Sequence, residues 1–536
     1  MGGEIHAIEL VFLLLLLFVV LFGALAEKLK MPYPIVLVIA GLALSFFHAA
    51  PRVTLNPDLI FLVVLPPLLY SSAWTTSWRD FRYNMVSIFS LAFGLVAFTV
   101  LAVATVTPWL LPDFDWRMGI VLGAVVAPTD AIAATSIARR VGLPKRVVDI
   151  LEGESLVNDA SALLALEFGL AMLRGGPVPS VGLGVYRLLF LIVVGIIVGL
   201  VIAEIVHWIE HLIDNGPIEI ALSILTPYAA YLAAEQLHAS GVLAVVTCGL
   251  YLSRKSSHFF SPDVRLQAWA VWGSLTYVLN GLVFVLVGLQ LPHVLDAIRG
   301  NSRLHLFFYA ASFSAFLILL RLLWVFPGAH LGYAVRRQVF HQHENTPPAS
   351  SIFVIGWTGM RGVISLAAAL SLPQMIGDQP FLQRNIIIFL AFAVIFVTLV
   401  LQGLTLPPLI RALGLSGAGD SDGEEKEARK TIFQAVLAFL STTRKAEDQS
   451  DFSAIFDDLE EHYRHRLAVL DEGASHDGRF SPKQHHRRLE LLRDLLQLER
   501  RTAVELRNHG RISDELLRKL ERELDLDEAR LREKTA

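Results

Sequence analysis

Asp159 is a carboxylate in an apolar stretch that runs from about Val147 to Leu173. A carboxylate at the depth of a bilayer is costly, and it normally marks an ion or proton path. On a helix Ser155 lies one turn before Asp159, so the two side chains bring oxygens to one spot. Hard cations such as Na⁺ bind oxygen ligands, and a carboxylate adds charge. These residues predict a site for a monovalent cation or a proton; the alternative is that they only hold helices together.

A second acid, Asp130, lies in the preceding apolar segment, directly after Pro128 and Thr129. Proline removes a backbone donor and interrupts a helix, and Thr129 or Asp130 would then cap the second half. A late segment from Gly356 to Ser365 is rich in glycine. Paired interruptions in the two halves of a chain indicate a transporter site built from broken helices in inverted repeats.

Two arginines also lie in apolar segments, Arg321 and Arg361. Arginine does not lose its charge in proteins, so a buried one needs a partner. We assign Glu154 to Arg321 as a structural ion pair that also involves Arg361, which leaves Asp159 free to bind and release ions. The alternative for Arg321 is that it extends to the membrane interface.

The composition is that of a membrane protein: 54% of the 536 residues are hydrophobic, and the mean hydropathy is +0.55. Long apolar runs indicate membrane spans. The formal charge of −4 does not indicate a nucleic-acid partner, and the single cysteine, Cys248, excludes an internal disulfide. We expect thirteen transmembrane helices, at about 7–26, 33–48, 57–73, 83–111, 118–138, 147–173, 182–212, 217–236, 238–253, 268–289, 304–334, 350–372 and 383–411.

Charge divides the chain into a membrane domain over residues 1–412, a linker over 413–423 and a tail over 424–536. Residues 421–536 carry 48 charged side chains, against 46 in the first 420 residues. Alternate loops carry thirteen and six Lys and Arg residues, and the tail belongs to the richer set. The positive-inside rule therefore predicts a cytoplasmic tail and an outside N-terminus. Leucine spacing around 489–499 and 516–531 predicts amphipathic helices in the tail.

Several motifs together resemble the sodium/proton exchangers of the first monovalent cation:proton antiporter family. They are Ala-Pro-Thr-Asp at 127–130, Gly-Glu-Ser-Leu-Val-Asn-Asp at 153–159, Arg321, Gly-Met-Arg-Gly at 359–362, Gln-Gly-Leu-Thr at 402–405 and Leu65-Pro66-Pro67. The resemblance implies thirteen spans, a homodimer in a bacterial plasma membrane, and a six-helix core with two crossed broken helices that moves like an elevator. It implies that Asp159 carries the ion and that Thr129, Asp130 and Ser155 surround it. Asn158 replaces the second acid of electrogenic relatives, which implies electroneutral exchange.

The mechanism we expect is competition between Na⁺ and H⁺ for Asp159 in a secondary antiporter with a role in pH homeostasis. It is not an enzyme and needs no cofactor; no Gly-x-x-x-x-Gly-Lys phosphate loop is present in the sequence. One alternative is a K⁺/H⁺ antiporter, since the ligands are oxygen for Na⁺, Li⁺ or K⁺. More distant alternatives are a cation channel, for which no filter motif is visible, and an intramembrane aspartyl protease. Only the segment from Gly417 to Asp420 resembles the motif of such proteases, and this segment lies in the linker.

Overall fold

The computed structural model describes most of the chain. The described residues are 2–46, 57–111, 113–175, 181–259, 261–298, 302–339, 347–376, 378–416, 421–446, 453–470, 495–503 and the isolated positions 505, 506, 509, 524 and 526. The chain divides into two compact units, Met1–Gly419 and Asp420–Ala536. Each unit is described by itself.

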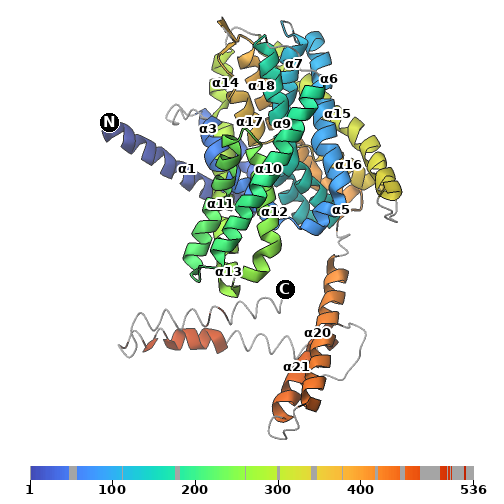
Figure 1. Ribbon diagram of the computed structural model, residues 1–536. Helices are drawn as coiled ribbons and strands as arrows, with labels where there is room; N and C mark the ends of the chain where they lie inside the picture. The colour runs from blue at the N-terminus through green and yellow to red at the C-terminus, as the bar shows by residue number, and fades with distance from the viewer. Residues whose placement is uncertain are drawn as a thin grey trace. The chain divides into compact units, whose positions relative to one another are not determined.

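The first unit is a bundle of helices with one short antiparallel pair of strands, β1 (Met375–Ile376) and β2 (Gln379–Pro380) (Figure 1). Its helices are α1 (Gly2–Lys28), α2 (Tyr33–Ser45), α3 (Pro57–Leu59), α4 (Leu65–Thr75), α5 (Trp78–Phe89), α6 (Val96–Leu110), α7 (Trp116–Val126), α8 (Ala131–Val141), α9 (Lys145–Leu173), α10 (Val181–Glu210), α11 (Gly216–Gln236), α12 (Gly241–Phe259), α13 (Pro262–Leu289), α14 (Leu291–Ala297), α15 (Arg303–Val339), α16 (Ala349–Trp357), α17 (Val363–Leu370), α18 (Arg384–Val397) and α19 (Gly403–Ala412). Three π-helical turns, η1 (Ile60–Val64), η2 (Ser90–Leu95) and η3 (Thr398–Gln402), join consecutive helices.

Within the described residues, ten helical stretches are long and apolar enough to cross a membrane, and α2 is a shorter apolar helix. Long apolar helices are the expected way for a chain to satisfy its backbone in lipid. The predicted all-helical, polytopic membrane architecture is therefore confirmed. The count of thirteen spans and the inverted repeats stay predictions.

Two of the apolar segments are interrupted helices. The segment that begins with α7 breaks after Val126, and α8 resumes at Ala131; Pro128 lies in the gap. The segment that begins with α16 breaks after Trp357, and α17 resumes at Val363. Helix ends leave backbone groups without intrahelical partners. Both breaks therefore bring polar backbone groups into the interior of the bundle.

Close packing of α2 against α13 depends on two glycines. A Cβ at Gly41 would lie 2.5 Å from the carbonyl oxygen of Val285, and one at Gly288 would lie 2.4 Å from that of Val38. Small residues let helix backbones approach closely in a membrane, where packing and not water drives association. These positions fix α13, which also supplies Asn280 to the site described below.

The second unit contains α20 (Ser421–Ala446) and α21 (Ser453–Leu470), which pack against each other. The Arg466 guanidinium carbon lies 4.5 Å from the ring centroid of Phe433, and Arg444 Nη1 lies 2.9 Å from Asp457 Oδ1. Residues 495–503 are helical. The helix predicted over 516–531 lies outside the described residues, except for positions 524 and 526, as do positions 489–494 and the motif at Gly417 to Asp420.

Candidate cation site

The two helix breaks meet each other. The backbone N–H of Asp130 donates to the carbonyl oxygen of Met360 at 2.8 Å. Ser365 Oγ, on α17, donates to the Pro128 carbonyl oxygen at 3.4 Å. Gly362 lies so close to Asp130 that a Cβ there would be 2.3 Å from Asp130 Oδ2. Each interruption thus supplies hydrogen-bond partners that the other interruption needs.

A cavity of about 70 Å³ opens beside this contact. About 10–15 Å³ is enough to hold one water molecule, so the cavity has room for a small ion. Asp159, Asp130, Thr129 and Ser155 all line it, so the structure brings together four of the residues singled out in the sequence. Its other lining residues are Ile60, Val64, Leu65, Leu68, Leu69, Ser72, Pro128, Ala131, Ile132, Glu152, Leu156, Asn280, Gly362, Val363, Ile364 and Ser365.

Asp159 is only 1% exposed and projects from α9. Its Oδ1 atom is buried and accepts no hydrogen bond from the described residues. Asp130 differs, because its Oδ1 accepts the backbone N–H of Ile132 at 2.8 Å and so caps α8. A buried carboxylate oxygen without a donor is costly unless another group compensates it. Asp159 therefore has an oxygen available for a ligand.

Hydroxyl groups from the α7–α8 break and from α9 hold the site together. Ser155 Oγ donates to the Thr129 carbonyl oxygen at 2.9 Å and accepts the N–H of Ala131 at 3.2 Å. Thr129 Oγ1 donates to Glu154 Oε1 at 3.1 Å and accepts from Asn158 Nδ2 at 2.7 Å. A hydroxyl has one donor and two lone pairs. Each hydroxyl thus retains one lone pair. The Asn158 amide nitrogen is engaged with Thr129, whereas its Oδ1 is buried and accepts no hydrogen bond from the described residues.

Glu154 pairs with Arg321 inside the bundle. Arg321 Nη1 lies 2.5 Å from Glu154 Oε1, and Nη2 lies 2.8 Å from Oε2, a bidentate arrangement. Both side chains are almost fully buried, and Arg321 Nη2 also donates to the Ile355 carbonyl oxygen at 3.1 Å. Bidentate, charge-assisted hydrogen bonds are the strong ones. The pair ties α9 to α15 and to the end of α16.

Arg361 has a different environment from the one expected. Its guanidinium donates to backbone carbonyl oxygens, from Nε to Val126 at 3.0 Å and from Nη1 to Gly359 at 2.5 Å. Among the described residues it forms no direct ion pair, and what its guanidinium contacts is backbone; its part in the Glu154–Arg321 pair stays a prediction. The physical reason for the backbone contacts is that α7 ends at Val126, and the carbonyls at a helix C-terminus attract a cation.

Four polar cavity residues were not assigned to the site from the sequence: Ser72, Glu152, Asn280 and Ser365. Ser365 ends the glycine-rich run that pointed to the second break, so its position was a usable signal. Glu152 lies two residues before Glu154, in the same polar segment. The sequence did not indicate a role for Asn280 at the site. It is a single polar residue in an apolar helix, and the other residues that line the cavity lie far from it in the chain.

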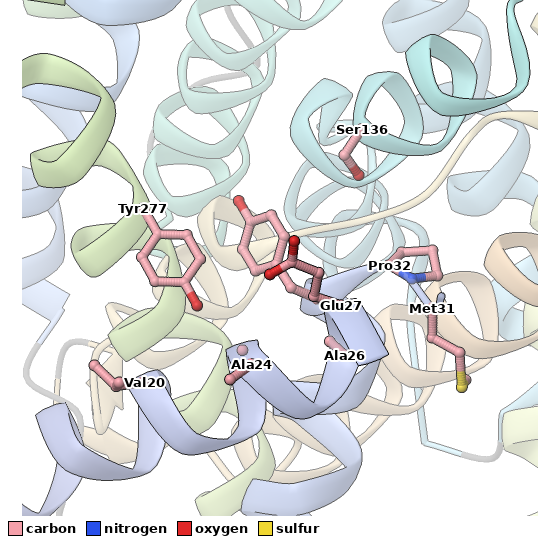
Figure 2. Close-up of a pocket in the computed structure, with 10 residues that line it drawn as sticks. Val20, Ala24, Ala26, Glu27, Met31, Pro32, Ser136 and Tyr277 are labelled. Atoms are coloured by element: carbon pink, nitrogen blue, oxygen red, sulfur yellow. The ribbon is translucent and has the colours of Figure 1, made fainter. Parts of the chain in front are cut away.

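A second cavity, of about 490 Å³, lies among α1, α2, α8 and α13 (Figure 2). Figure 2 shows Glu27 and Tyr277 beside this space, with Ser136 above them on α8. Tyr33 also lines it, and Asn280, which lines the first cavity, is a neighbour of the Tyr33 side chain. Tyr33 and Asn280 therefore lie between the linings of the two cavities.

A model of the transmembrane sodium/hydrogen exchanger family matches residues 13–412. The chain belongs to this family. The sodium/hydrogen exchanger family consists of transporters and not of enzymes, and its members are multi-pass membrane proteins. The channel and aspartyl protease alternatives therefore have no support.

Several relatives carry the same family name. A sodium/proton exchanger of Mycobacterium tuberculosis is 32% identical over 523 residues, which cover 96% of this chain and 94% of the relative. A sodium, potassium, lithium and rubidium/proton antiporter of Bacillus subtilis is 31% identical and covers 70% of this chain and 58% of the relative. The solved sodium/proton antiporter MjNhaP1 of Methanocaldococcus jannaschii has a TM-score of 0.59 at 20% identity, and covers 76% of this chain and 99% of that chain. This last likeness concerns the fold alone.

Proposed function

We propose that this exchanger is a secondary antiporter that exchanges Na⁺ for H⁺ at Asp159. One observation carries the proposal: Asp159, which has a buried carboxylate oxygen without a donor among the described residues, lines a cavity large enough for an ion. The Asp159 carboxylate would supply the charge. The remaining lone pairs of Ser155 and Thr129, with Asp130, would supply further oxygen ligands of the kind a hard cation needs.

Exchange follows if the Asp159 carboxylate holds either one proton or one cation. A bare carboxylate inside the bundle is costly, whereas the protonated and the cation-bound forms are both neutral. If the core moves across the membrane only in a neutral form, each cation carried one way requires a proton carried the other way. Asn158 cannot take up a proton at this site, so we propose one proton per monovalent cation and electroneutral exchange.

The moving element would be the part of the bundle that contains both interrupted helices, α7–α8 and α16–α17, with α9. Contacts between the two breaks, and the Glu154–Arg321 pair, favour movement of these helices as one body. We propose elevator-like alternating access in a homodimer, in a bacterial plasma membrane. The membrane domain would extend over residues 1–412, the linker over 413–423 and the cytoplasmic tail over 424–536, with the N-terminus outside.

The second cavity offers a route to the site from one side of the membrane. Glu27 lies beside Lys28 at the end of α1, which the positive-inside rule places in the cytoplasm. A carboxylate at the mouth of a narrow space raises the local concentration of cations. A cation would then pass Tyr33 and Asn280 to reach Asp130 and Asp159.

Potassium is the second candidate cation. The Bacillus subtilis relative is named for exchange of sodium, potassium, lithium and rubidium. Carboxylate and hydroxyl oxygens are ligands for all of these ions, and selectivity depends on the size and rigidity of the cavity. The cavity of about 70 Å³ has room for each of these ions, and the name of the family favours Na⁺ as the substrate.

The test is proton flux in proteoliposomes that contain only the purified protein. A pH-sensitive dye reports proton movement when Na⁺, Li⁺ or K⁺ is added outside, over a series of pH values. We expect dequenching with Na⁺ and Li⁺ at lower concentrations than with K⁺. A protein that moves protons with none of these cations would not be an antiporter of monovalent cations, and one that prefers K⁺ would be the potassium exchanger.

A further inference from the structure

A further cavity, of about 480 Å³, lies between α10 and α12 near their C-terminal ends. It shares no lining residue with the two cavities described above. The described residues that line this α10–α12 cavity are all polar, and four of the five are basic: His207, His211, Tyr251, Arg254 and Lys255. Cavities of about 300–1,000 Å³ are the usual size for ligand sites. The size and the basic lining together indicate an anionic ligand.

Helix periodicity brings the lining residues into two stripes that face one another. His207 and His211 lie one turn apart on α10, and Tyr251 lies one turn before Arg254 and Lys255 on α12. The N–H of His211 donates to the carbonyl oxygen of His207 at 3.4 Å, and the two ring centroids are 4.6 Å apart. Because α10 packs against α12, both stripes reach the same cavity.

Glu204, one turn before His207 on α10, links the two helices beside the cavity. Lys255 Nζ lies 3.4 Å from Glu204 Oε2, and the Tyr251 hydroxyl donates to the same oxygen. Lys255 Nζ also lies 4.8 Å from the ring centroid of Tyr251. An exposed ion pair is weak, and an ammonium group has three donors, so Lys255 can bind a second anion. Glu204 thus holds two of the lining side chains in place.

The position of these residues explains their charge but not the cavity that they share. Cations are favoured in the last turn of a helix, where unpaired carbonyls gather. Arg337 is such a cation: it occupies the last turn of α15, is exposed and lines none of the three cavities. Trp208, next to His207, is 64% exposed, and tryptophan is enriched where the membrane meets water. We therefore expect the α10–α12 cavity to lie at the depth of lipid head groups.

We propose that the α10–α12 cavity binds the phosphate group of an anionic ligand, with Arg254, Lys255 and His211 as donors. A guanidinium presents a rigid fork that matches phosphate oxygens, and its charge strengthens the hydrogen bonds. Basic pockets between membrane helices bind the head groups of anionic lipids. The glycerol phosphate of phosphatidylglycerol fills more of the cavity than free phosphate does. Both sources share the same chemistry, and the experiment distinguishes them.

The experiment measures thermal unfolding of the purified full-length protein in a neutral detergent. Wild type, Arg254→Gln, His211→Gln and Arg337→Gln are each titrated with phosphatidylglycerol, phosphatidylcholine or inorganic phosphate, at constant sodium concentration and ionic strength. Arg337→Gln is the matched control, because it removes the same charge from an exposed residue at another helix end. We expect phosphatidylglycerol to raise the melting temperature of wild type and of this control. Arg254→Gln should need at least roughly tenfold more lipid for the same shift, because charge-assisted hydrogen bonds are lost.

The measurements without ligand separate a lost site from a lost fold. Arg254 and His211 are exposed, so both variants should then melt as wild type does. If Arg254→Gln melts at a lower temperature, His211→Gln decides, and it should also need more lipid. A shift that inorganic phosphate reproduces would identify free phosphate as the ligand. The proposal is overturned if phosphatidylcholine acts as strongly as phosphatidylglycerol, or if neither phosphatidylglycerol nor phosphate shifts wild type. It is also overturned if Arg254→Gln and His211→Gln respond as Arg337→Gln does.

Discussion

The backbone N–H of Asp130 donates to the carbonyl oxygen of Met360 at 2.8 Å, and this bond joins two helix breaks that are far apart in the sequence. Neither break could remain inside a bundle alone, because each exposes backbone groups that need partners. The bond also holds Asp130 beside the cavity that Asp159 lines. The site thus depends on both halves of the membrane domain.

Replacing Asp159 by Asn is expected to abolish cation-dependent proton flux and to leave a folded protein. The amide keeps the volume of the side chain but cannot carry charge or exchange a proton. Dye dequenching in proteoliposomes measures the flux, and size-exclusion chromatography checks the fold. Exchange that persists in the purified variant would contradict a mechanism based on this one carboxylate.

Loss of either partner of the Glu154–Arg321 pair is expected to destabilise the protein strongly. Arg321→Ala should lower the free energy of unfolding by roughly 3–5 kcal/mol, because it leaves a buried carboxylate without its cation. The matched control is Glu167→Gln, which breaks an exposed pair whose Arg187 Nη2 lies 3.5 Å from Glu167 Oε1. Exposed pairs contribute about 0–1 kcal/mol. Equal melting temperatures for wild type and Arg321→Ala would show that the buried pair is not structural.

A methyl group at Gly362 is expected to damage transport through Asp130. The added Cβ would lie 2.3 Å from Asp130 Oδ2, so Gly362→Ala must displace either the carboxylate or the α16–α17 break. Small misplacements at a reacting centre cost on the order of a hundredfold in rate, and we expect the initial rate of exchange to fall at least roughly tenfold. Gly273→Ala is the control, because a Cβ there meets no atom within 4 Å. Similar rates for both variants would argue against a tight contact at the site.

The apparent affinity for Na⁺ is expected to weaken as the pH falls. A proton and a cation compete for Asp159, so the apparent cation constant should rise about tenfold per pH unit once the carboxylate is mostly protonated. Initial rates over a grid of sodium concentrations and pH values measure this constant. A constant that stays the same over the acidic range would mean that the proton and the cation bind at different groups.

Exchange should also be insensitive to membrane potential. Vesicles clamped at several potentials with valinomycin and potassium should reach the same sodium and proton distribution, with sodium as substrate. A distribution that shifts with the imposed potential would mean that a second group titrates during the cycle. Asp130 would be that group, since it lines the same cavity.

The sequence by itself determined the kind of protein and the chemistry of its centre. Apolar runs set the membrane architecture, because the bilayer demands long helices with satisfied backbones. Asp159 and Ser155 could be placed together because helix periodicity brings residues four apart onto one side. Pro128 and the glycines near Gly362 indicated where helices would break, because these residues disturb the helical backbone directly.

Only the tertiary structure decided which distant groups meet. Arg321 and Glu154 are 167 positions apart, and nothing in local periodicity selects this pair over Arg361 and Glu154. The rotation and tilt of each helix decide which arginine meets Glu154. Close packing of many side chains in turn sets the rotation and tilt of the helices. The same packing turns Arg361 toward the end of α7, directs the Asn158 amide to Thr129 and brings Asn280 to the cavity. Local sequence specifies each helix and its breaks, whereas the partners of a buried charge depend on the assembled bundle.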